Sequence, residues 1–458
     1  MSSRSGLTTP LRGGGARVRA LLVLLALMAP FSSGCATYSD KMAKVMETTT
    51  AGDFEASITK VEKIMGVGQR GQMPEKIESE TALGLLERGT LEQALFDYPG
   101  SSRDFIVADR ELQVLDLTDD TAGNIGRYVY SDSATLYQAT PTEKLSLNSF
   151  NMANFLANGD LRGSRVEARR FTVMQTYLEN SGIEEVHVAI GSYLAGFTFE
   201  MLGEWQGAIR YYDEALQAQR FESLGAPIRR LAPMTSFRGK MLAQVLAQGA
   251  AEEEREGAAD LLVVVSVGRV PFKVPKRIPI GAAVGMAGAW ISGNPEVLGH
   301  TAMKFVVYPE LVPNGSVYDK VRLRIDDRPA QLELASDLGA EITREYEEIK
   351  PRIIGAAISR MIVRAAASEG VRQAGNQQSA GLGWALALLT EAVMVAMDKP
   401  DTRSWMHLPE QVFVFRERLP AGQHEIEVML GSGGADSIAK TVTLQPGGYA
   451  AVVVTSPR

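Results

Sequence analysis

The hydrophobic period of the chain changes near residue 260, and this change limits the fold more than any other feature. Before it, apolar residues recur at helical spacing. After it, Leu261–Val267 is a largely β-branched run of strand length that ends at Gly268, and apolar residues alternate with polar ones in Val321–Ile325 and Glu425–Leu430. Such alternation is typical of an antiparallel sheet with one solvated face. The sequence therefore predicts an α+β protein in which helices precede strands.

The predicted strands are short apolar runs separated by turn residues. The segments 419–424 and 445–449 contain the proline and glycine that hairpin turns favour, whereas 271–279 holds too many prolines for a central strand. Together the runs predict an antiparallel β-sandwich or small barrel over residues 260–458. The other predicted strands cover residues 303–308, 317–325, 411–415, 424–430, 440–444 and 450–454.

A helical insertion interrupts this β-rich domain at about residues 336–399. Leu338, Ile342 and Tyr346 begin a helical spacing, and Pro351 is expected to kink or break the helix. Two apolar stretches, 281–291 and 381–397, are either packed core or contacts with lipid or a partner. The second has seventeen residues, and a bilayer core requires about 20 in a helix.

The segment around Gly203 has the pattern of two antiparallel helices. Small side chains at Gly196, Gly203, Ala208 and Ala215 would let the helices approach closely, and large ones would fill the groove between repeats. This pattern resembles a tetratricopeptide repeat (TPR). The resemblance predicts a TPR-like helical solenoid over residues 35–255. The expected packing residues include Gly159, Ser164, Phe199, Gly203, Trp205, Ala208, Tyr212 and Ala215.

Further copies of the pattern can be aligned on a small residue of the second helix. Ser57, Ser101, Ser164 and Ala208 give spacings of 44, 63 and 44 residues, so insertions separate the repeats. One copy has Phe96 at the position of the turn glycine. The insertion 121–142 carries Tyr128, Tyr130 and Tyr137, which either contact a partner or pack under the loop.

The first 34 residues have the form of a bacterial export signal. Four arginines precede the apolar segment 20–29, no acid occurs, and Cys35, the only cysteine, follows. The pattern resembles a lipoprotein signal peptide. This resemblance implies cleavage before Cys35 and attachment of lipid to its sulfur, with palmitate among the acyl chains. An uncleaved membrane anchor is the alternative, but the apolar segment is short for a span. By the same resemblance, Ala36 implies an outer-membrane lipoprotein that faces the periplasm.

Cleavage of that leader would change the formal net charge from −7 to −11, because it removes four arginines and no acid. Nucleic acid is not expected as a ligand, since its binding requires clustered basic residues. An anionic membrane surface would also repel the whole chain. With Cys35 acylated, no thiol is left for a disulfide, a thiolate metal site or a nucleophile.

Residues suited to catalysis are few. None of His187, His300, His407 and His424 has another histidine at the i, i+4 spacing of a helical zinc site, so no metal or cofactor is predicted. Ser57 and Ser437 each begin a Ser-x-x-Lys pattern, although Ser57 also fits as a packing residue. His424, beside Glu425 and Glu427, is a candidate acid or base, or else lies on the exposed face of a hairpin.

Two charged segments are candidate binding sites. Arg169 and Arg170, with Arg165 and Glu167, either receive a carboxylate or phosphate or pair with one another along the helix. In the segment 401–409, Asp401 can cap a turn, Arg403 can pair with it, and Trp405 can anchor the segment. The alternative is that Arg403 and Trp405 bind a sugar or peptide by charge and stacking.

The segments 35–41, 159–170 and 401–409 together resemble three signature blocks of an uncharacterised family of large TPR-like bacterial lipoproteins. The resemblance implies no catalytic residue and suggests a role in peptidoglycan assembly. We therefore expect a membrane-anchored interaction lipoprotein that holds an envelope protein or peptide in its repeat groove. The alternatives are an enzyme that acts on a cell-wall polymer and an accessory subunit of an export apparatus or pore.

Overall fold

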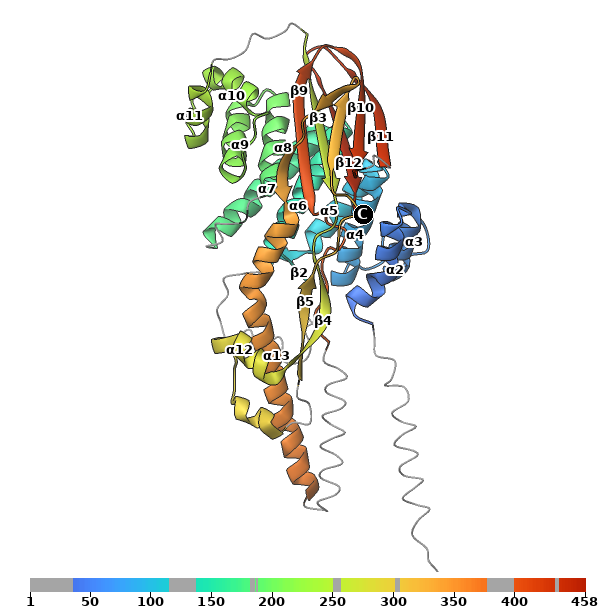
Figure 1. The fold of residues 1–458 in the computed structure, drawn as a ribbon, viewed down its shortest axis with the longest axis vertical. Coiled ribbons are helices and arrows are strands. Elements are labelled where there is room, and N and C mark those ends of the chain that lie inside the picture. The colour runs from blue at the N-terminus through green and yellow to red at the C-terminus, as the bar shows by residue number, and fades with distance from the viewer. Residues whose placement is uncertain are drawn as a thin grey trace, which may run out of the picture.

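The computed structural model describes residues 36–114, 137–181, 186, 188–249, 257–300, 305–376, 399–432 and 436–458. Helices precede strands in a mixed α+β fold, as the sequence predicted (Figure 1). Several predicted features lie outside the described residues. They are Cys35, the loop tyrosines Tyr128 and Tyr130, His187 and the apolar stretch 381–397.

The helices form hairpins that pack against one another in chain order. In four hairpins the first helix, α2, α4, α6 or α8, faces the strands, and we call the surface that these four share the inner face. Two residue pairs, Gln113–Val114 (β1) and Gln138–Ala139 (β2), form a short parallel ladder. The helices are α2 (Tyr38–Thr50), α3 (Phe54–Ile64), α4 (Ser79–Ala94), α5 (Tyr98–Glu111), α6 (Pro141–Ala157), α7 (Leu161–Asn180), α8 (Ala189–Met201), α9 (Trp205–Ala218), α10 (Gly225–Leu231) and α11 (Lys240–Ala247).

The same turn joins the two helices of the first four hairpins. A residue with positive φ follows the first helix, and its amide and the next amide bond back to the carbonyls of the last turn, as in a Schellman motif. Gly52, Gly159 and Gly203 occupy this position, and Phe96 occupies it with φ +63°. The small residues used for the alignment, Ser57, Ser101, Ser164 and Ala208, are all fully buried on the second helices.

Eight strands form two four-stranded sheets. The inner sheet has the order β12-β3-β9-β8 and the outer sheet β11-β10-β6-β7. The prediction of a purely antiparallel sandwich is wrong, because β12 pairs with β3 in parallel, a relation that alternation alone does not specify. The strands are β3 (Ala259–Val267), β6 (Val321–Ile325), β7 (Arg328–Ala330), β8 (Glu333–Asp337), β9 (Gln411–Leu419), β10 (Gly422–Leu430), β11 (Asp436–Leu444) and β12 (Tyr449–Ser456).

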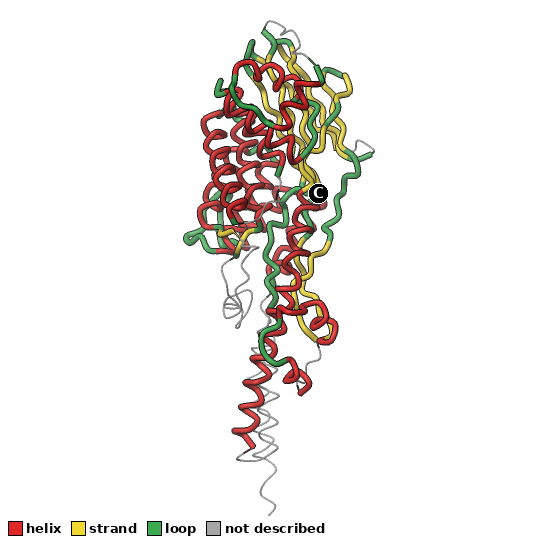
Figure 2. The backbone as a smooth tube through the Cα atoms, turned by 90° about the vertical axis from the view of Figure 1, so that its left-hand side faces the viewer, coloured by secondary structure: helices red, strands yellow, loops and turns green. Residues whose placement is uncertain are grey.

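The inner sheet is the middle of three layers (Figure 2). On β3, Leu261, Val263 and Val265 face the outer sheet, whereas Leu262 and Val264 join the core of the helices. Every residue of β3 is buried, which explains why Leu261–Val265 is a continuous apolar run and does not alternate.

An arm extends from these layers (Figures 1 and 2). It consists of the antiparallel pair β4 (Phe272–Pro279) and β5 (Phe305–Val312), α12 (Ile280–Ala287) and the long helix α13 (Leu338–Asn376). The expected break at Pro351 does not occur, and α13 continues through it. No helix in the described part of the chain is long and apolar enough to cross a membrane.

Candidate functional site

The segment 401–409, just before β9, is inserted into the inner face of the helices. Trp405 is 0% exposed, and its ring centroid lies 5.6 Å from that of Phe105 on α5 and 6.2 Å from that of Phe150 on α6, both edge-on. Its Nε1 donates to Oγ1 of Thr90 on α4 at 3.0 Å. This part of the inner face is therefore filled by the protein's own chain, and Trp405 presents no surface to an external sugar or peptide.

Two buried carboxylates hold the backbone of this segment. Glu143 on α6 accepts the amide of Trp405 at 2.8 Å. Glu87 on α4 accepts the amides of Met406 at 2.8 Å and His407 at 2.9 Å. Hydrogen bonds to a charged acceptor are about twice as strong as neutral ones, and these lie away from water. Three consecutive amides are thus fixed by side chains that the sequence analysis did not single out.

Glu87, His407 and Thr49 form a chain that resembles a catalytic triad in its distances. Nδ1 of His407 lies 2.6 Å from Oε2 of Glu87, and Nε2 lies 2.8 Å from Oγ1 of Thr49. The carboxylate can only accept, so it favours a proton on Nδ1 and leaves Nε2 to face the hydroxyl. All three side chains are fully buried, and neither described pocket includes them. Ser57, from the Ser-x-x-Lys pattern, packs beside Thr49 at 2.9 Å.

Asp401 and Arg403 pair with each other. The guanidinium of Arg403 donates to both carboxylate oxygens of Asp401, at 2.8 and 2.7 Å, and the Arg403 amide donates to the same side chain at 3.0 Å. The guanidinium carbon also lies 5.8 Å from the ring centroid of Tyr137. Tyr137 is buried and donates to Glu143 at 2.5 Å. These residues make a turn that seats the segment, and Tyr137 packs beneath it.

The three arginines of the charged segment on α7 lie at or near the surface, whereas its glutamate is buried. Arg165 pairs with Glu204 at 2.6 Å, Arg170 pairs with Glu167 at 2.8 Å, and Arg169 is exposed. Glu167 is buried and accepts a hydrogen bond from Asn148. Burial raises the pKa of Glu167 above its ordinary value, against the lowering by Arg170. The pairing along the helix therefore holds for Arg170 and Glu167, whereas Arg165 pairs with a residue outside α7.

The repeat-packing residues lead to a buried charge network. Tyr212 donates to Glu200, and Arg416 on β9 donates to Tyr212 at 2.8 Å and lies 3.0 Å from Glu200. Burial opposes ionisation of Glu200, but Arg416 and Arg230 bring its net pKa below the ordinary value. Ser164, Ala208, Tyr212 and Ala215 are buried, and Gly159 and Gly203 form the turns. Trp205 is the exception, because at the first position of α9 its side chain is exposed.

His424 does not meet the neighbouring acids. Strand alternation directs His424 inward and Glu425 outward, so the predicted acid–base group is not assembled. The ring of His424 instead contacts Asp326 at 2.7 Å and the carbonyl of Pro420 at 2.8 Å. Burial lowers the pKa of His424, but these two acceptors raise it overall. Ser437 donates to Glu427 on the outer sheet.

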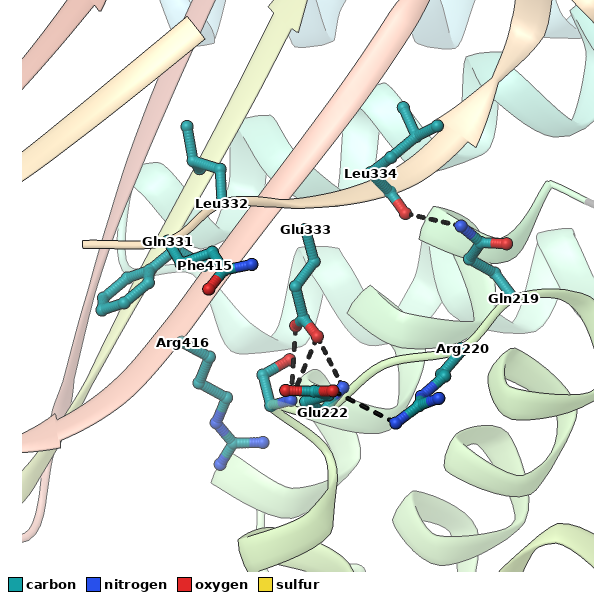
Figure 3. A pocket seen from close by; sticks show the side chains of 10 residues that line it. Gln219, Arg220, Glu222, Gln331, Leu332, Glu333, Leu334, Phe415 and Arg416 are labelled. Atoms are coloured by element: carbon teal, nitrogen blue, oxygen red, sulfur yellow. Dashed lines mark hydrogen bonds and ion pairs between the residues drawn. The ribbon is translucent and has the colours of Figure 1, made fainter.

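A pocket of about 400 Å³ lies between the loop 219–223 and the edge strand β8 (Figure 3). Glu333 points to the loop and accepts the amides of Glu222 and Ser223, and Gln219 donates to the carbonyl of Leu334 at 3.0 Å (Figure 3). These polar groups already satisfy one another. The pocket therefore offers few converging donors or acceptors to a ligand.

A second pocket, of about 380 Å³, lies between α10 and α11 at the end of the helical array. Leu242, Phe237 and Leu246 contribute apolar surface, and Arg229 and Arg238 contribute charge. Leu246 is 40% exposed. Nε of Arg229 is buried, and among the described residues it has no hydrogen-bond acceptor. A ligand with an apolar side chain next to a carboxylate would fill the apolar surface and supply an acceptor to Nε of Arg229.

The described ranges contain no group of three or more histidine, cysteine, aspartate or glutamate side chains placed to hold a metal ion. The strongest site signals that sequence reasoning missed are Glu87, Thr90 and Glu143. Their only trace is polarity on α4 and α6, helices that are buried nearly all round. Comparisons of the chain with protein-family models, curated proteins and solved structures found no match.

Proposed function

We propose that this protein is an outer-membrane lipoprotein that faces the periplasm and binds an envelope protein or peptide. Acylated Cys35 would anchor it, and the first helix starts at Tyr38, three residues later. The folded part would then hang close to the bilayer surface. The family resemblance suggests that this partner acts in peptidoglycan assembly.

The helical part is, in this proposal, a TPR-like solenoid. Four hairpins with one common turn and a buried small residue on each second helix support this interpretation. Arrays of this kind bind partners on their broad concave surfaces. Here the segment 401–409 and strands of the inner sheet cover much of the inner face. We therefore place the partner elsewhere on the array.

The pocket between α10 and α11 is the observation that carries the proposal. It is the more apolar of the two pockets. It also lies beside α11, which is the last described helix of the array and ends at Ala247. Terminal repeats of soluble arrays normally carry a polar cap. This end instead presents Met234 and Leu246, both exposed, with arginines beside them. The partner would insert an apolar side chain and place a carboxylate against Arg229 or Arg238.

Crosslinking in intact cells followed by detergent purification tests the binding surface. The wild-type chain should retain a stoichiometric partner. Leu246→Glu should reduce its yield about tenfold, the loss that corresponds to ~1.4 kcal/mol of an interface anchor. Val173→Glu is the matched control, because Val173 is 69% exposed on α7 and lies outside both pockets. Equal yields from both variants would move the partner away from this pocket.

The anchor is tested separately. Metabolic labelling with palmitate should mark the chain and fail to mark Cys35→Ser, and mass spectrometry should find the processed terminus at residue 35. An intact leader with no label would overturn the lipoprotein assignment. The enzyme alternative has its best geometry at Glu87, His407 and Thr49, and the complete burial of that chain weighs against it.

A further inference from the structure

We infer that the distal arm is a second contact with the membrane, at which α12 and Trp290 lie in the headgroup region of a bilayer that contains anionic phospholipid. The inference rests on the proposed lipid anchor for its orientation. Its physical basis is the surface chemistry of the arm.

The segment of the arm around α12, which packs beside the middle of α13, is uncharged and apolar. Residues 278–295 contain no charged side chain. On α12, Ala283 and Ala287 pack against α13, whereas Gly281, Ala282, Gly285 and Met286 are exposed. The short 3₁₀ helix Gly288–Trp290 continues this surface, with Met286 41% and Trp290 36% exposed. A small helix with one packed face and one exposed apolar face has the composition of an interfacial segment and is too short to span.

Arginines lie beside this surface, and one exposed acid, Glu296, follows it in the chain. The guanidinium carbon of Arg352 lies 4.7 Å from the ring centroid of Trp290, and Arg277 is exposed on β4. From residue 350 to residue 366 α13 carries four basic residues and no acid. Arg360 is buried and Lys350 pairs with Glu310 and Glu347, so Arg352 and Arg364 are the two that reach the surface here. Tryptophan flanked by arginine is typical of the membrane interface, where the ring sits at headgroup level and the cation meets phosphate.

The net negative charge of the whole chain does not prevent α12 from contacting an anionic membrane. Ile354 and Ile358, which pack under α12, lie roughly 25–30 Å along α13 from Leu338 at a rise of about 1.5 Å per residue. That separation exceeds the Debye length of about 8–10 Å at physiological salt. A membrane at α12 therefore responds to the charges of the arm, and the charges of the helical and β-sheet layers are screened from it.

The arm also lies on the appropriate side. Figure 1 shows α12 and the distal part of α13 extending in the direction to which the start of α2 points. Residue 36, which directly follows the proposed lipid attachment, precedes that helix. A bilayer that holds Cys35 would thus lie on the side toward which the arm, with α12, extends. Among possible occupants, lipid accounts for the apolar face, the tryptophan and the basic rim together.

The single cysteine allows a direct test in the full-length, processed protein. Met286→Cys would be the only free thiol if Cys35 is acylated, and it can carry an environment-sensitive fluorophore. The protein is reconstituted in vesicles of phosphatidylethanolamine and phosphatidylglycerol with brominated acyl chains. We expect a blue shift and roughly twofold quenching at position 286. Val173→Cys, exposed on α7, is the control and should show neither.

Each other outcome has a distinct meaning. Labelling of the wild-type chain would show a free Cys35, and so a failure of the proposed anchor alone. Equal, unquenched emission at positions 286 and 173 in vesicle-bound protein would overturn the membrane contact. A blue shift without quenching, together with crosslinking of two copies through position 286, would overturn it in favour of self-association. Matching circular dichroism melts of the two cysteine variants show that both are folded.

Discussion

The carboxylate of Glu87 binds both the backbone and the ring of His407, a residue 320 positions later in the chain. Its Oε2 lies 2.9 Å from the His407 amide nitrogen and 2.6 Å from Nδ1. Its Oε1 accepts the amide of Met406 and the hydroxyl of Tyr38. One buried side chain therefore joins α2, α4 and the segment 401–409, which makes the inner face a folded core and not an open groove.

Loss of this carboxylate should be severe. Glu87→Ala leaves four buried donors without their acceptor, and removal of one partner from a buried charged network costs about 3–5 kcal/mol. Urea denaturation monitored by circular dichroism measures the change in the free energy of unfolding. Glu80→Ala is the control, because Glu80 forms an exposed pair with Lys41, for which at most about 1 kcal/mol is expected. Similar costs for both variants would contradict the role of Glu87.

The two tryptophans Trp405 and Trp205 should respond differently to the same substitution. Trp405→Ala removes a fully buried ring and the donor to Thr90, and we expect a cost of about 3–5 kcal/mol. Trp205→Ala removes a ring that is 43% exposed, and the cost should stay below about 1 kcal/mol. Thermal melts of both variants provide the comparison. A mild effect at Trp405 would mean that the segment is not held in the array.

Local sequence patterns predicted the elements well, because they depend on near neighbours. The apolar run at Leu261–Val267 and the alternation at Glu425–Leu430 both lie in strands, and each of the four helix turns lies five residues before an aligned small residue. The degenerate copy also has this turn, since Phe96 takes the left-handed conformation.

Long-range relations were not predictable in this way. Nothing local distinguishes a parallel from an antiparallel partner for the strand Tyr449–Ser456. The burial of Trp405 depends on Thr90, Phe105 and Phe150, which lie hundreds of residues earlier in the chain. A tryptophan beside an arginine has the same composition whether it anchors a segment or binds a ligand. Only the tertiary fold separates these two interpretations.

Glu345 gives stability a measurable pH dependence. Burial raises the pKa of Glu345 from 4.5 to about 7, against hydrogen bonds from Thr142 that lower it. Between these values the folded state keeps a proton that the unfolded chain has lost, so the free energy of unfolding falls as pH rises, by up to ~1.4 kcal/mol per pH unit. Glu345→Gln keeps the acceptor for Thr142 at 2.9 Å and should remove this contribution. Denaturation from pH 5 to about 8 measures it.

The control for this experiment is Glu341→Gln on the same helix, since Glu341 forms a partly exposed pair with Arg344. That variant should keep the pH dependence of the wild type. A Glu345→Gln profile parallel to the wild type across the whole range would show that the carboxyl group is ionised in the folded protein.

The left-handed turn at Phe96 can be tested by the order of two substitutions. Phe96→Ala and Phe96→Gly both lose the ring contacts with Tyr98 and Lys440, so their difference isolates the backbone at φ +63°. We expect the glycine variant to be about 1 kcal/mol more stable than the alanine variant, because a Cβ is strained in this conformation.

Gly159→Ala is the converse case, because φ is +72° and a new Cβ would meet nothing within 4 Å. The expected loss of about 1 kcal/mol is therefore backbone strain alone. Urea denaturation of the three variants measures both differences, and an alanine variant at position 96 as stable as the glycine variant would show that this turn does not carry the strain.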